Sequence, residues 1–299
     1  MKQLFSLTKR NIKLFFKDKG MFFTSLITPL ILLVLYATFL GNVYKDAFLL
    51  SLGEGAALLP KSTLNALVGG QLVSSLMAVS CITVAFCSNM LMVQDKANGT
   101  AADFLISPVS PKVLAIAYYL GTLFSTLIIC AVALGAGLIY LTAFGWALSF
   151  ADVLLLVLDC FLLVLFGTAL SSVVNFFLSS QGQISAVGSI VSAGYGFISG
   201  AYMPISNFSE GLQAVMSFLP GTYGTALLRN HAMRGAFEKM NGIIPAEGLA
   251  EMKASADCSI SFFGNAVSTG ASYAILVGAT LLLLGVYVLL NVMKNRKKK

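Results

Sequence analysis

The sequence predicts an all-α integral membrane protein with six transmembrane helices. Hydrophobic residues make up 58% of the 299-residue chain, charged residues only 10%, and the mean hydropathy is +0.88. A soluble domain carries about 25% charged residues, so this composition is typical of a membrane protein. Residues 22–40 form an uncharged run of about 20 residues, the length that crosses a bilayer as a helix. The alternating strands of a membrane barrel would not produce such runs.

Basic residues gather at the two ends of the chain. Of the 19 Lys and Arg residues, six precede Gly20 and five follow Val292. Cytoplasmic segments are enriched in Lys and Arg, so both termini are predicted to be cytoplasmic in a multi-pass protein of the cell membrane. Two ends on one side require an even number of spans. Each cluster adjoins a membrane segment, which indicates the lipid bilayer as its partner and argues against nucleic acid.

Residues 1–20 are predicted to form an amphipathic helix in the cytoplasmic interface. Its basic side chains share one face of a helical wheel, and large apolar side chains cover the other. Such a helix places its basic face on anionic headgroups. The six-helix domain follows over residues 21–293, and residues 294–299 form a basic cytoplasmic tail.

The six spans follow from the apolar runs. They are predicted at residues 22–40, 62–94, 113–144, 152–178, 184–202 and 273–291. The second run would form a helix about 50 Å long, longer than a hydrocarbon core of about 30 Å, so we expect it to tilt, break or project into the cytoplasm. Its Ser, Thr and Asn side chains could line a pathway, but interhelical hydrogen bonds are favoured.

One acidic residue, Asp159, lies inside the fourth predicted span. A carboxylate at that depth is costly and by default suggests function. It is therefore a candidate for a transport pathway. The alternative is a protonated or hydrogen-bonded acid that faces the bundle or an outer vestibule.

The fifth predicted span carries a ridge of small residues. Gly188, Ser192, Gly196 and Gly200 recur at every fourth position, a spacing that lets helices approach closely. Helix packing is the favoured interpretation, and a ligand groove is the alternative.

Two further segments separate the last two spans. Residues 203–233 contain two short amphipathic patterns, Glu210 to Leu219 with Ser209 as cap and Thr222 to Met233. Each is too short to cross a bilayer, so re-entrant or interfacial helices are expected. Residues 234–258 are polar and are predicted to form an outer loop, as are residues 41–61 after the first span.

A polar island at residues 94–111 separates the second and third spans. Asn98-Gly99 is a turn signal, and Thr100 with Asp103 makes a potential capping box that starts a helix at Ala101. Pro108 limits that helix to about two turns. Phe104 and Leu105 lie on a helix too short to bury them alone. The island is either a loop whose apolar residues dip into the headgroups or a peg that docks a cytoplasmic protein.

The island also resembles the cytoplasmic coupling segment of type 2 ABC-transporter permeases. The resemblance rests on Gly99-Thr100, Phe104-Leu105 and the Ser107-Pro108-Val109-Ser110 element. Asp95 and Lys96 match the first two charges of the family's acidic-basic-acidic cluster, whereas Ala97 replaces the second acid. Pro111 also stands where a basic residue is common. A second region is similar to the family in Ser199-Gly200, Met203-Pro204, Leu219-Pro220, Tyr223 and Arg229.

The resemblance implies a permease subunit of an ABC exporter whose peg enters a groove of a cytoplasmic ATPase subunit. It implies coupling roles for Asp95, Lys96, Gly99, Thr100, Phe104, Leu105 and Pro108. The permease would pair with itself or with a similar permease. No cofactor is expected on this chain, and ATP and Mg would be bound by the partner.

No residue pattern in the sequence predicts a reaction that this chain would catalyse. Gly is nowhere followed by Lys, so the chain has no phosphate-binding Walker loop, and a single His supports no catalytic triad. No metal site is expected, and the five Cys residues are predicted to be small packing residues. The sequence does not identify the substrate. Two other classes stay open, an ion-gradient-driven secondary transporter, for which Asp159 is thin support, and a non-transporting membrane scaffold.

Overall fold

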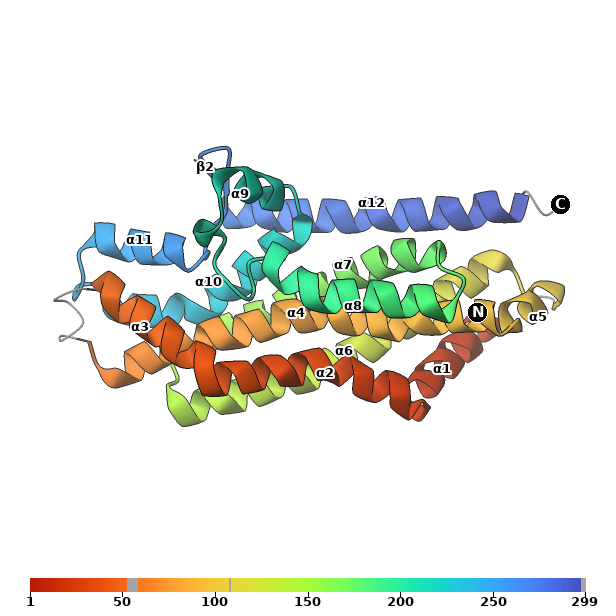
Figure 1. The fold of residues 1–299 in the computed structure, drawn as a ribbon, viewed down its shortest axis with the longest axis horizontal. Coiled ribbons are helices and arrows are strands. Elements are labelled where there is room, and N and C mark those ends of the chain that lie inside the picture. Colours follow the sequence, from red (N-terminus) through yellow and green to blue (C-terminus); the bar gives the residue numbers. More distant parts are fainter. Residues whose placement is uncertain (53–58, 108, 297–299) are drawn as a thin grey trace.

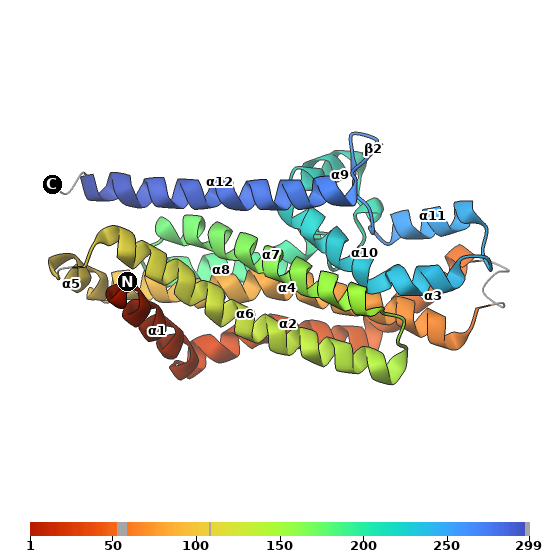
Figure 2. The ribbon, with the colours of Figure 1, turned by 180° about the vertical axis from the view of Figure 1, so that it is seen from behind.

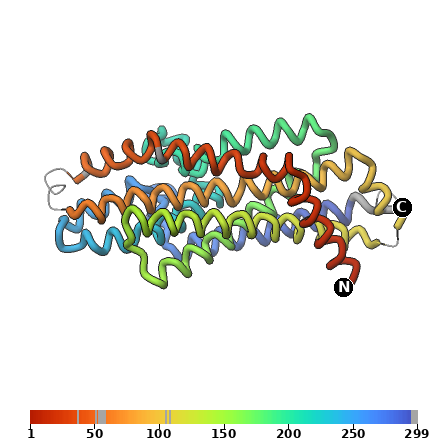
Figure 3. Tube along the Cα trace, turned by 90° about the horizontal axis from the view of Figure 1, so that it is seen from below, coloured from red at the N-terminus to blue at the C-terminus, as the bar shows by residue number. Residues whose placement is uncertain are grey.

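The computed structural model describes residues 1–52, 59–107 and 109–296, and nearly all of them are helical. Long helices lie side by side along one axis, and the 37-residue helix α4 (Lys61–Ala97) runs through their centre (Figures 1 and 3). Around it lie α2 (Lys19–Leu35), α6 (Pro111–Phe144), α7 (Phe150–Phe176), α8 (Gln181–Ile198) and α12 (Thr269–Arg296). The all-α membrane fold is confirmed.

Among the described residues, five stretches of helix are long and apolar enough to cross a membrane. They are residues Lys19–Leu50, Lys61–Ala97, Pro111–Phe144, Phe150–Phe177 and Thr269–Met293. Helix α8, which corresponds to the fifth predicted span, is not among them because it has only 18 residues and begins with the polar Gln181-Gly182-Gln183. The six-span count therefore stays a prediction.

The first predicted span continues well past its expected end. Helix α2 contains Pro29, passes into a π-helical turn, η1 (Tyr36–Leu40), and continues as α3 (Gly41–Leu52). The predicted loop at 41–61 is wrong over this part, and residues 53–58 lie outside the described residues. Tyr44 and Phe48, one turn apart, are buried on one side of α3 while Lys45 and Asp46 stay exposed. The segment is an amphipathic helix that a search for uncharged runs misses.

Helix α4 neither breaks nor ends early, and its polar side chains are almost all buried. Ser80 and Thr83 donate to backbone carbonyl groups one turn earlier. Asn89 Nδ2 donates to Ser171 Oγ at 3.0 Å and to Ser172 Oγ at 2.9 Å, both on α7. The interhelical hydrogen bonds favoured from the sequence are thus found for Asn89, whereas Ser80 and Thr83 bond within α4 itself.

The chain between α8 and α12 is more ordered than predicted. It forms η3 (Ile205–Asn207), α9 (Glu210–Ser217), α10 (Pro220–Met240), α11 (Ala246–Ser255), and a small hairpin of β1 (Ser261–Phe262) and β2 (Asn265–Ala266). The two expected short helices are present as α9 and α10, but α10 extends beyond Met233. The predicted outer loop at 234–258 is wrong because α10 and α11 bury Phe237, Met240, Leu249 and Met252 there.

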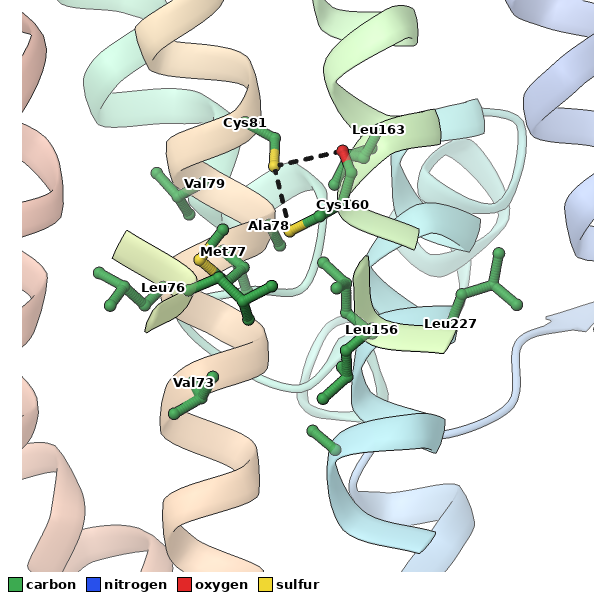
Figure 4. Packing of buried hydrophobic residues seen from close by; sticks show 14 of the residues in the cluster. Val73, Leu76, Met77, Ala78, Val79, Cys81, Leu156, Cys160, Leu163 and Leu227 are labelled. Atoms are coloured by element: carbon green, nitrogen blue, oxygen red, sulfur yellow. Dashed lines mark hydrogen bonds between the residues drawn. The ribbon is translucent and has the colours of Figure 1, made fainter. Parts of the chain in front are cut away.

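The core lies along α4, α7 and α10. Figure 4 shows α4 packed against α7 through Met77, Leu156 and Leu163. Cys81 and Cys160 face each other with their Sγ atoms 4.0 Å apart, and all five Cys residues are free and buried. This includes Cys258, whose polar sequence neighbourhood gave no sign of burial.

Both chain ends lie at the same end of the molecule. The described N-terminus, the last described turns of α12 and helix α5 (Thr100–Ile106) lie together at one end, whereas α3 and α11 lie at the opposite end (Figures 1 and 2). The amphipathic helix α1 (Lys2–Lys17) meets α2 at Asp18, whose carboxylate caps α2 by accepting from Met21 N at 3.1 Å. The tail predicted at 294–299 begins inside α12, and residues 297–299 lie outside the described part.

Candidate functional site

The segment that joins α4 to α6 forms a protruding helix–turn at this end. Asn98 ends α4, and Gly99 adopts φ +82° so that the chain can reverse into α5. A Cβ at Gly99 would meet nothing within 4 Å, so the glycine is required by its left-handed backbone and not by lack of space. Ser107 is extended and ends α5, and Pro111 begins α6 at its N-terminal turn, where proline fits.

The predicted capping box does not form. Gly99 is the N-cap of α5, and no side chain caps the helix. The helix begins at Thr100, one residue earlier than predicted, because the left-handed Gly99 already turns the chain into the helical path. Thr100 therefore lies in the first turn instead of capping it.

Asp95 links the site to two other helices. Its carboxylate accepts from Arg10 Nη1 at 2.8 Å, Arg10 Nη2 at 3.1 Å and the Tyr118 hydroxyl at 2.6 Å. These contacts join α4 to α1 and α6. Partial burial lowers the pKa of Arg10, but the hydrogen bonds and charge of Asp95 outweigh it, so the pKa is raised overall. Arg10 was not singled out by the sequence, where it is one basic residue in a basic helix.

Lys96 holds the end of α7. Its Nζ donates to the carbonyl groups of Asn175 at 3.0 Å, Phe176 at 2.8 Å and Leu178 at 3.2 Å. A cation at this position satisfies carbonyl groups that the end of a helix leaves unpaired and interacts well with the helix dipole. Both Asp95 and Lys96 therefore make their described contacts within the chain.

The exposed surface of α5 differs from the expected one. Phe104 is half-buried, and the Arg10 guanidinium carbon lies 5.0 Å from its ring centroid. Ile106 is 88% exposed, next to the exposed Ala102 and Asp103. The sequence missed Ile106, although an isoleucine in a polar island is the available signal. The side chain of Leu105 and all of Pro108 lie outside the described residues.

Asp159 lies in a buried cluster between α7, α10 and α12. Its Oδ2 lies 2.6 Å from His231 Nδ1 on α10, and its Oδ1 accepts from the Tyr273 hydroxyl on α12 at 2.6 Å. One turn further along α10, Arg234 Nη2 lies 2.5 Å from Asp152 Oδ1 of α7. Because both oxygens of Asp159 have partners, this geometry fits the hydrogen-bonded alternative better than a free acid in a pathway.

The four ridge residues of α8 have different surroundings. A Cβ at Gly188 would lie 2.8 Å from Met90 Cε of α4, so Gly188 permits close helix packing. Ser192 accepts through its carbonyl from the Tyr202 hydroxyl at 3.2 Å, and a Cβ at Gly196 would collide with the Tyr202 ring. Gly200 has φ +74° and ends the helix. The ridge thus packs against α4 at Gly188 and against Tyr202, which follows the helix, at Ser192 and Gly196.

Arg229 stabilises the chain reversal at the C-terminal end of α8. The side chain is fully buried and donates to Asp257 Oδ2 at 2.9 Å and to the carbonyl groups of Gly200 and Ala201. The Gln71 amide oxygen, turned toward the guanidinium, accepts from Arg229 Nε at 3.2 Å. Burial raises the pKa of Asp257, and the charge of Arg229 opposes this effect.

A groove opens between α2, α4 and α8. Its volume is about 470 Å³, and it begins at Asp18 near the α5 end. Its lining is mixed: polar side chains such as Thr24, Thr28, Gln94, Ser185, Ser189 and Ser192 alternate with apolar ones such as Met21, Ile27, Met90 and Ile184. Hydroxyl and amide groups on the face of a membrane helix are costly against lipid, so this face favours a protein or polar neighbour over hydrocarbon. Gly188 and Ser192 thus also border a groove, the alternative left open from the sequence.

These features define a polytopic helical membrane protein with a short helix, α5, between its second and third long helices. The chain matches the ABC-2 type transporter family over residues 2–232 and belongs to it. The matched region includes α1, α5 and the start of α10. A comparison with curated proteins finds no match. The protein is therefore a multi-pass membrane component of an ABC transporter, and such permeases carry no ATPase site of their own.

Proposed function

We propose that this permease exports its substrate with energy from a separate cytoplasmic ATPase subunit that docks on α5. The observation that carries the proposal is that the end of α4, which leads directly into α5, is bonded to three other helices. Arg10 and Tyr118 bind Asp95 at the end of α4, and the next residue, Lys96, binds the end of α7. A force on α5 would therefore reach α1, α4, α6 and α7 together.

Asp95 and Lys96 act in this scheme as positioning residues. Gly99 and Thr100 shape the turn, and α5 presents Ile106 and the edge of Phe104 to the partner. ATP and Mg are bound by the partner and not by this chain. For nucleotide binding to move the permease, the ATPase must bind one conformation of the α5 region more tightly than the other.

The groove between α2, α4 and α8 is the proposed route of the substrate. The hydroxyl and amide groups in its lining favour a protein neighbour, and in this proposal a second permease, identical or similar, closes the groove from its open side. Two grooves facing each other would form one path between the subunits. The free face of α8, with Ser185 and Ser189 exposed, is then an interface and not a lipid contact.

The docking proposal is tested with Ile106→Asp. Burying a carboxylate in an apolar contact is strongly unfavourable, so co-purification of the cytoplasmic ATPase with this variant should fall at least tenfold. Phe104→Asp should give the same loss. The matched control is Ile243→Asp, an exposed isoleucine at the opposite end of the molecule (37% exposed), which should keep the partner. If Ile106→Asp and Phe104→Asp both insert and still retain the ATPase and transport, α5 is not the docking site.

A further inference from the structure

The groove stops short of the end of the molecule where α3 lies. Helices α2 and α8 both run along α4 (Figure 1). The lining of the groove reaches Thr28 on α2 and Ser192 on α8. Further along α2, Leu32 and Tyr36 are only 2% and 1% exposed, so the space beside them is filled.

Three tyrosine side chains tie α2 and α3 to the end of α8. The Tyr36 hydroxyl donates to Ala201 O at 3.2 Å, and the Tyr44 hydroxyl donates to Tyr202 O at 3.1 Å. The Tyr202 hydroxyl reaches back to Ser192 O at 3.2 Å. The rings of Tyr36 and Tyr44 are stacked, with their centroids 5.8 Å apart and their planes 7° apart. We call Tyr36, Tyr44 and Tyr202 the tyrosine latch.

A second hollow lies on the other side of the latch. Its volume is about 350 Å³, and its lining includes Tyr44 and Tyr202 together with Gln71, Asn207 and Ser255. We call it the α3 pocket. Tyr202 lines this pocket while its hydroxyl contacts the last groove residue of α8. No described residue lines both the groove and the pocket.

The groove, the latch and the pocket follow one another along the helices that they share. On α2 and α3 the order is Thr28 of the groove, Tyr36 of the latch and Leu40 of the pocket. On α4 the groove residues begin at Cys87, and Gln71 of the pocket lies several turns nearer the α3 end. The two hollows therefore lie in line, and the latch interrupts that line.

A π-helical turn, η1, lies beside the latch. It begins at Tyr36, whose carbonyl group accepts from Gly41 N across the turn. A Cβ at Gly41 would lie 2.7 Å from that oxygen, so the turn requires glycine there. Such turns are rare, occur often at functional sites and bend helices. On the other side of the latch, Arg229 holds the carbonyl groups of Gly200 and Ala201. The side that can move is therefore α3.

We propose that the tyrosine latch is the gate that closes the export path at the end away from α5, and that α3 swings on η1 to open it. The gate presupposes the proposed route along the groove, but not the docking of an ATPase on α5. Hydroxyl–carbonyl hydrogen bonds exchange for hydrogen bonds to water at little net cost, so the latch can open while the helices around it stay folded.

The gate is tested by the accessibility of a cysteine directly behind it. Ser192→Cys in the native membrane is treated with a small, membrane-impermeant methanethiosulfonate; the native Cys residues are all buried. In inverted membrane vesicles the new thiol should react, because the groove begins near the α5 end. In intact cells it should react at least tenfold faster once Tyr36→Phe and Tyr44→Phe are added, since both variants keep the ring and lose the hydrogen bond. An unchanged rate would overturn the gate.

The controls separate the gate from general loosening of the fold. Tyr287→Phe removes a hydroxyl–carbonyl bond of similar length, to Ala115 O at 3.2 Å, nearer the α5 end. It should leave the rate in intact cells unchanged, and an increase as large as that of the latch variants would also overturn the gate. Asn207→Cys, exposed in the α3 pocket, should react in intact cells at the same rate with and without the latch variants.

The inverted vesicles separate the gate from the route. If Ser192→Cys does not react there, the groove holds no water, and the proposed route fails together with its gate. If it reacts there and its rate in intact cells ignores the latch variants, the route stands and the gate alone is wrong.

Discussion

At the scale of single residues, Asp95 joins the end of α4 to both α1 and α6. Removing it by Asp95→Ala leaves the guanidinium of Arg10 and the hydroxyl of Tyr118 without their acceptor. Breaking a buried pair costs about 3–5 kcal/mol, and Arg10 is 28% exposed, so water recovers part of this. We expect a loss of about 2 kcal/mol in the free energy of unfolding, measured by denaturant unfolding in detergent.

The control for this prediction is Asp103→Ala, an exposed acid eight positions further along the chain. Surface substitutions usually change stability by less than about 0.5 kcal/mol. If the effects of Arg10→Met and Asp95→Ala on the free energy of unfolding are additive in a double-mutant cycle, the pair contributes no interaction energy. It then does not couple α1 to α4.

Gly200 adopts a left-handed backbone conformation that favours glycine. It has φ +74°, and an added Cβ would lie 2.8 Å from Ile205 Cγ1 and 3.2 Å from Asp257 Oδ2. Gly200→Ala should therefore lower the melting temperature, with a cost of about 1–3 kcal/mol from strain. Gly194→Ala, in the middle of α8 with open space around it, should be neutral or stabilising by up to about 1 kcal/mol. Equal melting temperatures for the two variants would contradict this account.

Residue patterns in the sequence located the island but not its internal contacts. The turn at Gly99 follows from Asn98-Gly99, a local signal. The contacts of Asp95 with Arg10 and of Lys96 with the end of α7 join residues about 80 positions apart. Such pairings depend on how α1 and α7 pack against α4, and one sequence carries no record of that packing. The wrong capping box arose because Gly99 could start the helix itself.

At the scale of elements, run length predicted the long uncharged helices and missed helical segments that carry exposed charges. Charges at Lys45 and Asp46 interrupted the apolar run, so 41–61 was assigned to a loop. Helix α3 instead exposes those charges and buries Tyr44 and Phe48. The second half of α10 was assigned to a loop for the same reason, because its charged residues also interrupt the apolar pattern.

Helix α8 is the least supported of the long helices. It packs mainly on α4, with the groove on one side and a cavity between α8 and α12 on the other. Helix α4, by contrast, is 94% buried over its most apolar part. Amide hydrogens exchange through local openings, which are easier where few contacts must break. Hydrogen exchange in nanodiscs should therefore be at least tenfold faster for the middle of α8 than for the middle of α4. Equal protection of the two helices would show that α8 is held by neighbours other than α4.

At the scale of the whole molecule, the chain ends and α5 share one end, and the charge distribution gives that end an orientation. The helix α1 and the start of α2 carry six Lys and Arg residues, and the end of α12 leads into the basic tail. The positive-inside rule places such an end in the cytoplasm. With that orientation, we expect helices α3 and α11 on the outer side of the membrane.

This orientation is tested by labelling single cysteines with a membrane-impermeant maleimide. The native Cys residues are all buried, so labelling of introduced, exposed positions can be measured against a low background. Asp103→Cys in α5 should react only after the membrane is permeabilised, because the ATPase that α5 is proposed to engage is cytoplasmic. Asp46→Cys in α3 should react in intact cells. The reverse pattern would place α5 outside, out of reach of any ATP-dependent partner. A push on α5 could then not drive transport, whatever the contacts of Asp95 and Lys96.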